Sequence, residues 1–205
     1  MNKIDFKKDL KHLYQPSPKK VGVVDVPEMN FLMIDGEGDP NNSEQFQNAV
    51  EALYGISYTT KFTLKKKGLG PDYVVPPLEG LWWMKNNEEF DMEKKELWLW
   101  TLMIAQPEHI SREEIENSIV LVKEKKDPPA LSEVRFQNFQ EGLAVQIMHI
   151  GPYAEERPTI QKVHQFADEN HYILCGKHHE IYLSDPNRTK PERLKTVIRH
   201  PVKQK

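Results

Sequence analysis

The sequence of 205 residues has one cysteine, no long apolar run and no strong excess of either charge. The lone Cys175 excludes an internal disulfide framework and fits a reducing compartment. No apolar stretch approaches membrane-spanning length, and the first residues lack an apolar signal region, so we expect a soluble cytoplasmic protein. With 28 basic against 31 acidic residues, the chain has no basic field that would attract nucleic acid directly.

The sequence has eight histidines, which could bind a metal ion, but their spacing does not support a metal site. His178 and His179 are neighbours on a predicted strand and point apart, and His178 with Glu180 lacks a convincing third ligand. We therefore expect no metal and no other cofactor. Neither a nucleophilic serine motif nor a cysteine–histidine pairing indicates covalent catalysis.

Hydrophobic periodicity predicts an α+β chain. Helical spacing predicts four helices: over residues 5–14, from Ser43 onward, over 112–126 and around Ile160. At the start of the helix over 112–126, Ser111 and Glu114 form a capping box. Strands are predicted at residues 30–34, at the end of 72–84, and at 97–104, 142–150, 178–185 and 195–199, with a turn at 85–93.

The order strand, helix, strand, strand occurs in both halves of the chain. We therefore expect a tandem pseudo-repeat of two β-α-β-β modules, whose two sheets face each other across a central ligand cleft. The expected boundaries are an N-terminal helix and lead-in over 1–27 and one domain over 28–205. That domain comprises a first module at 28–107, a connecting helix at 111–127 and a second module at 133–202.

The strand at residues 178–185 alternates apolar and polar side chains. A period of two places His178, Glu180 and Tyr182 on one face and Ile181 and Leu183 on the other. A carboxylate that loses hydration among rings has a raised pKa and becomes a better base near neutral pH. We therefore expect Glu180 and Tyr182 to be catalytic, with His178 beside the ligand. The alternative for Glu180 is a salt bridge to Arg188 or Arg199.

Tryptophans supply flat faces for a ligand. Trp98 and Trp100 share a face of their strand, whereas Trp82 and Trp83 point opposite ways, and we favour Trp82 for the cleft. These rings can instead be ordinary core. Two weaker ligand-binding candidates are Tyr153, which can also simply pack after its glycine-proline turn, and Glu79, whose neighbour Gly80 can mark a bulge.

Four segments resemble the GyrI-like (gyrase-inhibitor-like) small-molecule-binding superfamily: FLMIDGEGDP (31–40), PLEGLWW (77–83), EGLAVQIMHIGPY (141–153) and HHEIYLSD (178–185). The resemblance covers essentially the full length and implies an SHS2-type fold. In related drug-binding domains a buried glutamate among aromatic rings receives flat, often cationic drugs, and Glu180 stands at the matching position.

One free-standing branch of that superfamily is more similar to this chain: the cyclopropanoid cyclopropyl hydrolases. The resemblance implies cofactor-free hydrolysis of the cyclopropane in DNA-alkylating compounds such as yatakemycin, within an aromatic cage, giving cellular protection and drug resistance. We expect a monomer whose partner is a small aromatic xenobiotic. The alternatives are a non-catalytic sensor that sequesters flat aromatic or cationic drugs, and a protein-interaction role such as shielding gyrase.

Overall fold

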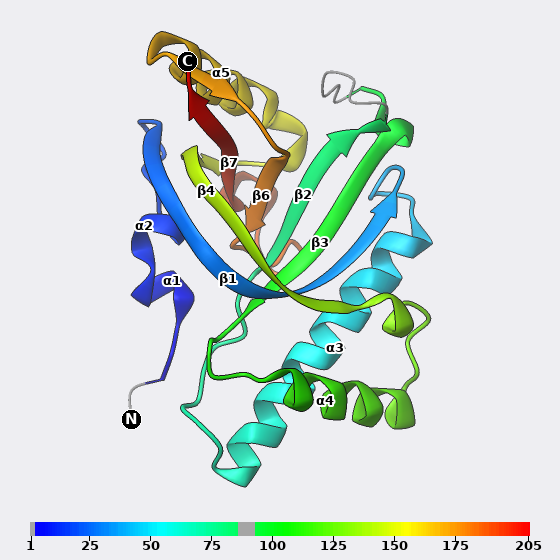
Figure 1. The fold of residues 1–205 in the computed structure, drawn as a ribbon. Coiled ribbons are helices and arrows are strands. Elements are labelled where there is room, and N and C mark those ends of the chain that lie inside the picture. Colours follow the sequence, from blue (N-terminus) through cyan, green and yellow to red (C-terminus); the bar gives the residue numbers. More distant parts are fainter. Residues whose placement is uncertain (1–2, 86–92) are drawn as a thin grey trace.

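The fold is built around one strongly curved antiparallel sheet (Figure 1). The computed structural model describes residues 3–85 and 93–205, so most of the turn predicted at 85–93 lies outside the described residues. The helices are α1 (Phe6–Asp9), α2 (Lys11–Tyr14), α3 (Glu44–Lys67), α4 (Arg112–Lys125) and α5 (Arg157–Glu169). The strands are β1 (Gly22–Glu37), β2 (Leu78–Met84), β3 (Trp98–Gln106), β4 (Arg135–Ile150), β5 (Tyr172–Leu174), β6 (His178–Tyr182) and β7 (Lys195–Gln204).

Six strands close into a barrel-like sheet. Their order is β4-β1-β3-β2-β6-β7, β4 pairs again with β7, and β5 pairs with the C-terminal end of β7, beyond the closed sheet. The mixed helix and sheet fold is therefore confirmed. The first half has the expected order β-α-β-β, whereas the second half has the additional strand β5 and runs β-α-β-β-β. The expected pair of sheets facing each other across a cleft is not confirmed, because β2 of the first half pairs directly with β6 of the second half. The pseudo-repeat itself stays a prediction.

Helices cover the outer face of this sheet in two places. Helices α3 and α4 pack on β1, β2 and β3, while α5 packs on β4 and β7 (Figure 1). The side chain of Ser43 accepts a hydrogen bond from the backbone of Phe46 to start α3, and Gly68 ends that helix with φ 67°. The predicted capping box of α4 is present, with Ser111 and Glu114 bonded reciprocally. The central strands β2 and β6 therefore run between the two helical layers.

The inner face of the sheet is closed at one end by an N-terminal arm, residues 3–21. The single helix predicted over 5–14 is broken at Leu10, where φ −113° and ψ 50° leave the helical region, so α1 and α2 are separate short turns. Leu13 and Tyr14 of α2 are buried against inner-face residues of β1, β4, β6 and β7. Among the described residues, no helix is long and apolar enough to cross a membrane.

Candidate functional site

Strand β6 presents different chemistry on its two faces. His178, Glu180 and Tyr182 point to the outer face, between the helical layers, whereas His179 and Ile181 point into the barrel. The pairings Trp82↔His178 and Gly80↔Glu180 place β2 beside β6. Because directly paired residues share a face, Trp82 lies on the same face as Glu180.

Glu180 is held by hydrogen bonds from its own strand. Oε1 lies 3.1 Å from His178 Nε2, and the Tyr182 hydroxyl donates to Oε2 at 2.7 Å. The indole of Trp82 in turn donates to the Tyr182 oxygen at 3.1 Å. The Glu180 side chain is 13% exposed, so it is shielded but reachable. A row of donors from Trp82 through Tyr182 therefore orients this carboxylate.

Neither arginine considered as a partner of Glu180 contacts it. Arg199 points into the barrel and pairs with Glu141 at 3.1 Å, and Arg188 lies at the surface 3.4 Å from Asp185. The partner on the outer face is His178. Burial raises the pKa of Glu180, but the hydrogen bond and charge of His178 and the hydrogen bond of Tyr182 outweigh it, so the pKa is lowered. The raised pKa that we expected for this carboxylate is therefore wrong in direction.

A second carboxyl, Glu156, faces Glu180 and was missed by the sequence analysis. It immediately precedes α5, and only 2% of the residue is exposed. Burial, followed by the charge of Glu180, raises the pKa of Glu156 to about 10. Among the described residues, Oε1 of Glu156 has no hydrogen-bond partner within 3.5 Å. The two carboxyls therefore titrate as a coupled pair, and at neutral pH the pair holds one proton and one negative charge.

Nothing in the local sequence distinguishes Glu156 from its exposed neighbour Glu155. The only available signal was its position directly before a helix that follows the turn at Gly151-Pro152-Tyr153, where a carboxylate is common for reasons of helix polarity alone. Its proximity to Glu180 depends on how α5 docks against β4 and β7.

Aromatic rings line the outer face beside this pair of carboxyls. The rings of Trp82 and Trp98 meet edge to face at 5.4 Å, and Phe46 of α3 stacks over Trp82 at 6.2 Å and meets Trp100 at 5.3 Å. Trp82 is 3% exposed, Trp98 is 7% exposed and Trp100 is fully buried. All three rings belong to the hydrophobic core that α3 covers, so the structure supports the alternative that these tryptophans are core residues, with Trp98 the most exposed of them.

Trp83 points to the inner face, where the Lys177 ammonium sits 3.3 Å from its ring centroid. The structure thus places Trp82, and not Trp83, with Glu180. Tyr153 lies at the rim of the site: it is 36% exposed, and its ring meets that of Tyr182 edge-on at 5.6 Å.

Gly80 lies beneath the site without a bulge, since it pairs regularly with both Leu102 and Glu180. A methyl group at this position would stand 2.7 Å from the Trp82 indole nitrogen and 3.2 Å from the Tyr182 hydroxyl. Glycine is needed here so that these two polar groups can meet directly over the backbone of β2.

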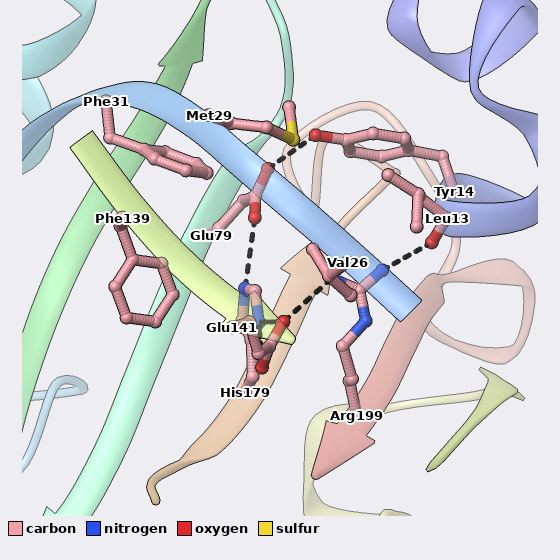
Figure 2. Close-up of a pocket in the computed structure, with 10 residues that line it drawn as sticks. All are labelled: Leu13, Tyr14, Val26, Met29, Phe31, Glu79, Phe139, Glu141, His179 and Arg199. Atoms are coloured by element: carbon pink, nitrogen blue, oxygen red, sulfur yellow. Dashed lines mark hydrogen bonds and ion pairs between the residues drawn. The ribbon is translucent and has the colours of Figure 1, made fainter. Parts of the chain in front are cut away.

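Glu79 does not join the outer-face site. It points into the barrel, where it accepts a hydrogen bond from Tyr14 at 2.9 Å and lies 3.0 Å from His179 Nε2 (Figure 2). The opposite nitrogen of His179 contacts both oxygens of Glu141, at 2.9 and 3.0 Å, and Arg199 completes the group. We call these five residues the barrel cluster: Tyr14, Glu79, Glu141, His179 and Arg199.

The barrel cluster is fully buried around a cavity of about 10 Å³, room for one water molecule. Burial lowers the pKa of His179, but Glu141 and Glu79 outweigh it and raise the value to about 9. Burial likewise raises the pKa of Glu141, but His179 and Arg199 bring it down to about 2. The cluster therefore consists of two cations and two carboxylates.

The barrel cluster also fastens the N-terminal arm. Arg199 donates to the carbonyl of Leu13 at 2.7 Å, and the Gln146 amide donates to that of His12 at 2.6 Å. Together with the hydrogen bond from the Tyr14 hydroxyl to Glu79, these two bonds hold the arm in place as one wall of the barrel interior (Figure 2). Glu79 is therefore enclosed by the barrel cluster, where a ligand does not reach its side chain. Over residues 3–85 and 93–205, no group of three or more His, Cys, Asp or Glu side chains could hold a metal ion.

Comparisons with known proteins support the fold described above and identify its family. The family model of the GyrI-like small molecule binding domain matches residues 19–203. A crystal structure of a Listeria innocua protein described as an uncharacterized conserved protein is 43% identical, with a TM-score of 0.91, covering 98% of this chain and 100% of that one. A protein described as a hydrolase from the same organism is 42% identical, with a TM-score of 0.86 and the same coverage.

The C-terminal domain of EcmrR shares only the fold: it is 15% identical with a TM-score of 0.56, covering 91% of this chain and 98% of that domain. No protein with a curated description matches the chain. The match to the family model over nearly the whole chain decides the assignment: this protein belongs to the family of the GyrI-like small molecule binding domain.

Proposed function

We propose that the outer-face site binds a flat aromatic electrophile and hydrolyses it, and that the reaction is the opening of the cyclopropane in cyclopropanoid DNA-alkylating agents such as yatakemycin. The observation that carries the proposal is a buried pair of carboxyls, Glu180 and Glu156, beside a group of aromatic rings. The hydrogen bonds of Glu180 lower its pKa and burial raises the pKa of Glu156 to about 10, so the pair keeps one negative charge near neutral pH. The similarity to proteins described as hydrolases supports catalysis over binding alone.

Glu180 is the general base of the proposed reaction. Its bonds to His178 and Tyr182 fix the carboxylate at the site, and its remaining exposure leaves room for a water molecule. The water oxygen forms a bond to a cyclopropane carbon, the strained carbon–carbon bond breaks, and its electron pair moves to the conjugated carbonyl oxygen. Glu180 takes the water proton, and the phenolate produced takes a proton from solvent. No external oxidant, reductant or cofactor is needed.

Glu156 keeps the pair of carboxyls at a single negative charge. Two adjacent ionised carboxylates would repel each other, and a second proton would remove the base. In the proposed mechanism the proton of the pair resides on Glu156, whose pKa is raised by burial, and the negative charge resides on Glu180. Trp82, Trp98 and Tyr153 supply ring faces and edges for the substrate, each stacking contact contributing roughly 0.5–1.5 kcal/mol beyond area burial.

The test is to incubate the purified protein with a cyclopropanoid alkylator and to follow the ring-opened product by mass spectrometry. Glu180→Gln should retain binding, measured by quenching of tryptophan fluorescence, and lose about 10²- to 10⁴-fold in rate. Glu156→Gln should also slow turnover, whereas its exposed neighbour Glu155 gives a matched control, since Glu155→Gln should leave the rate unchanged.

Two results would reject the proposal. Stoichiometric protection of the alkylator without turnover identifies the protein as a sequestering sensor of flat aromatic drugs. An unchanged rate in Glu180→Gln removes Glu180 from the mechanism.

A further inference from the structure

Three histidines form a row that leads from Glu180 to the protein surface. His178 contacts Glu180 at 3.1 Å, its ring lies 6.1 Å from that of His200, and the His200 ring lies 5.5 Å from that of His164. The first two come from adjacent strands: β6 pairs with β7 through His179↔Arg199, which sets His178 opposite His200. The third comes from α5, which covers β7, and it is exposed.

We propose that His178, His200 and His164 form a proton path that connects Glu180 with solvent on the side away from the ligand. The inference deepens the proposed function, on which it rests. Each turnover leaves a water proton on Glu180, and a bound aromatic ligand covers the small part of this side chain that solvent can reach. While the ligand is bound, a route that avoids the ligand lets the base return its proton before the product leaves.

The ring geometry suits proton transfer. An imidazole has two nitrogens and can take a proton on one while it releases a proton from the other. The ring separations of 5.5 and 6.1 Å place neighbouring rings within reach of one bridging water or a small ring rotation. His178 already directs Nε2 to Glu180, so transfer onto the row begins at an existing contact.

His200, the middle histidine of the row, is neutral near pH 7. Burial, then the nearby His178 and His164, lower the pKa of His200 to about 3, although Glu141 opposes this shift. Its Nδ1 is buried and makes no hydrogen bond with the described part of the chain. These three groups, His178, His164 and Glu141, together with burial, account for the shift in the pKa of His200. A neutral ring with an unused nitrogen can pass a proton without trapping it as a cation.

Two measurements distinguish the proposed proton path from the proposed hydrolysis. The first needs no substrate: the protein is mixed rapidly into D₂O, and the shift of the neutral carboxyl stretching band is followed by stopped-flow infrared, with Glu156→Gln identifying the band. With the site filled by the ring-opened alkylator, His200→Phe should slow this exchange about tenfold or more. Added imidazole should restore it. His12→Gln, at an exposed position on the arm, is the control and should exchange like the unaltered protein.

The second measurement is turnover of the alkylator. His200→Phe should keep binding and the single-turnover rate but lower kcat, with a larger solvent deuterium isotope effect and rescue by imidazole. His164→Ala, at the surface, should show the same pattern more weakly, and it serves if His200→Phe does not fold. Exchange and kcat that are unchanged in both variants would overturn the path. Altered exchange in a protein without any turnover would keep the path and reject the proposed hydrolysis instead.

Discussion

Replacing Glu141 by glutamine tests the charge balance inside the barrel. Two carboxylates, Glu79 and Glu141, face two cations, His179 and Arg199, so the cluster charge is −2 + 2 = 0. Glutamine leaves a net charge of +1 in a site that is fully buried. Removing one partner from a buried ion pair costs about 3–5 kcal/mol, because the remaining charge is uncompensated. We expect Glu141→Gln to lower the free energy of unfolding by this amount.

The same substitution should change how stability depends on pH. In the folded protein the pKa of His179 is raised to about 9 from its ordinary value of 6.5, so the native state holds a proton that the unfolded chain releases between these two values. Stability is thus fully present below pH 6.5 and is lost as pH rises through 9. A difference of 2.5 pKa units amounts to on the order of 3 kcal/mol. Without Glu141 this loss should largely disappear.

Urea unfolding at several pH values between 6 and 10, followed by tryptophan fluorescence, measures both effects. Glu37→Gln is the matched control, because Glu37 is 59% exposed in its salt bridge with Lys85 and should change stability by no more than about 1 kcal/mol. A loss below about 1 kcal/mol in Glu141→Gln, with the alkaline slope retained, would refute a charged and balanced cluster.

Three further substitutions probe local contacts, each by urea unfolding. Gly36→Ala should destabilise by about 1–3 kcal/mol or more, because the added methyl would lie 2.1 Å from the buried Trp100 ring; Gly22→Ala, with open space around it, should cost less than about 0.5 kcal/mol. Ser111→Ala removes the cap of α4 and should cost about 1 kcal/mol; an unchanged midpoint would show that the cap is dispensable. Tyr14→Phe leaves a buried carboxylate oxygen without its donor and should cost about 1.5–3 kcal/mol, with faster hydrogen exchange in the arm; protection equal to that of the unaltered protein would contradict the role of the hydroxyl.

Local patterns identified those parts of the site that depend on one strand or one helix turn. Alternation along residues 178–182 is a property of the strand itself, so it placed His178, Glu180 and Tyr182 together. The same rule separated Trp82 from Trp83. The cap at Ser111 was equally readable, because it depends on residues three positions apart.

The remainder depends on contacts between distant segments. Periodicity does not say which strand pairs with which, so the direct pairing of β2 with β6, which makes one closed sheet, was not foreseen. Glu156 and Glu180 meet only because α5 docks over β7, and Glu79 meets His179 only because β2 adjoins β6. The pKa of Glu180 followed its hydrogen bonds and not its burial, and those bonds are visible only in three dimensions.

The different side chains on the two faces of β6 limit which insertions and deletions the strand tolerates. Inserting or deleting one residue within this short strand would turn His179 toward the helices and send Glu180 into the barrel, exchanging a charge-matched interior for a mismatched one. Such a shift would remove the imidazole of His179 that lies between the carboxyl groups of Glu79 and Glu141. Insertions and deletions should therefore be confined to the loops that flank the strand. The barrel cluster on the inner face thus helps to fix the position of Glu180 on the outer face.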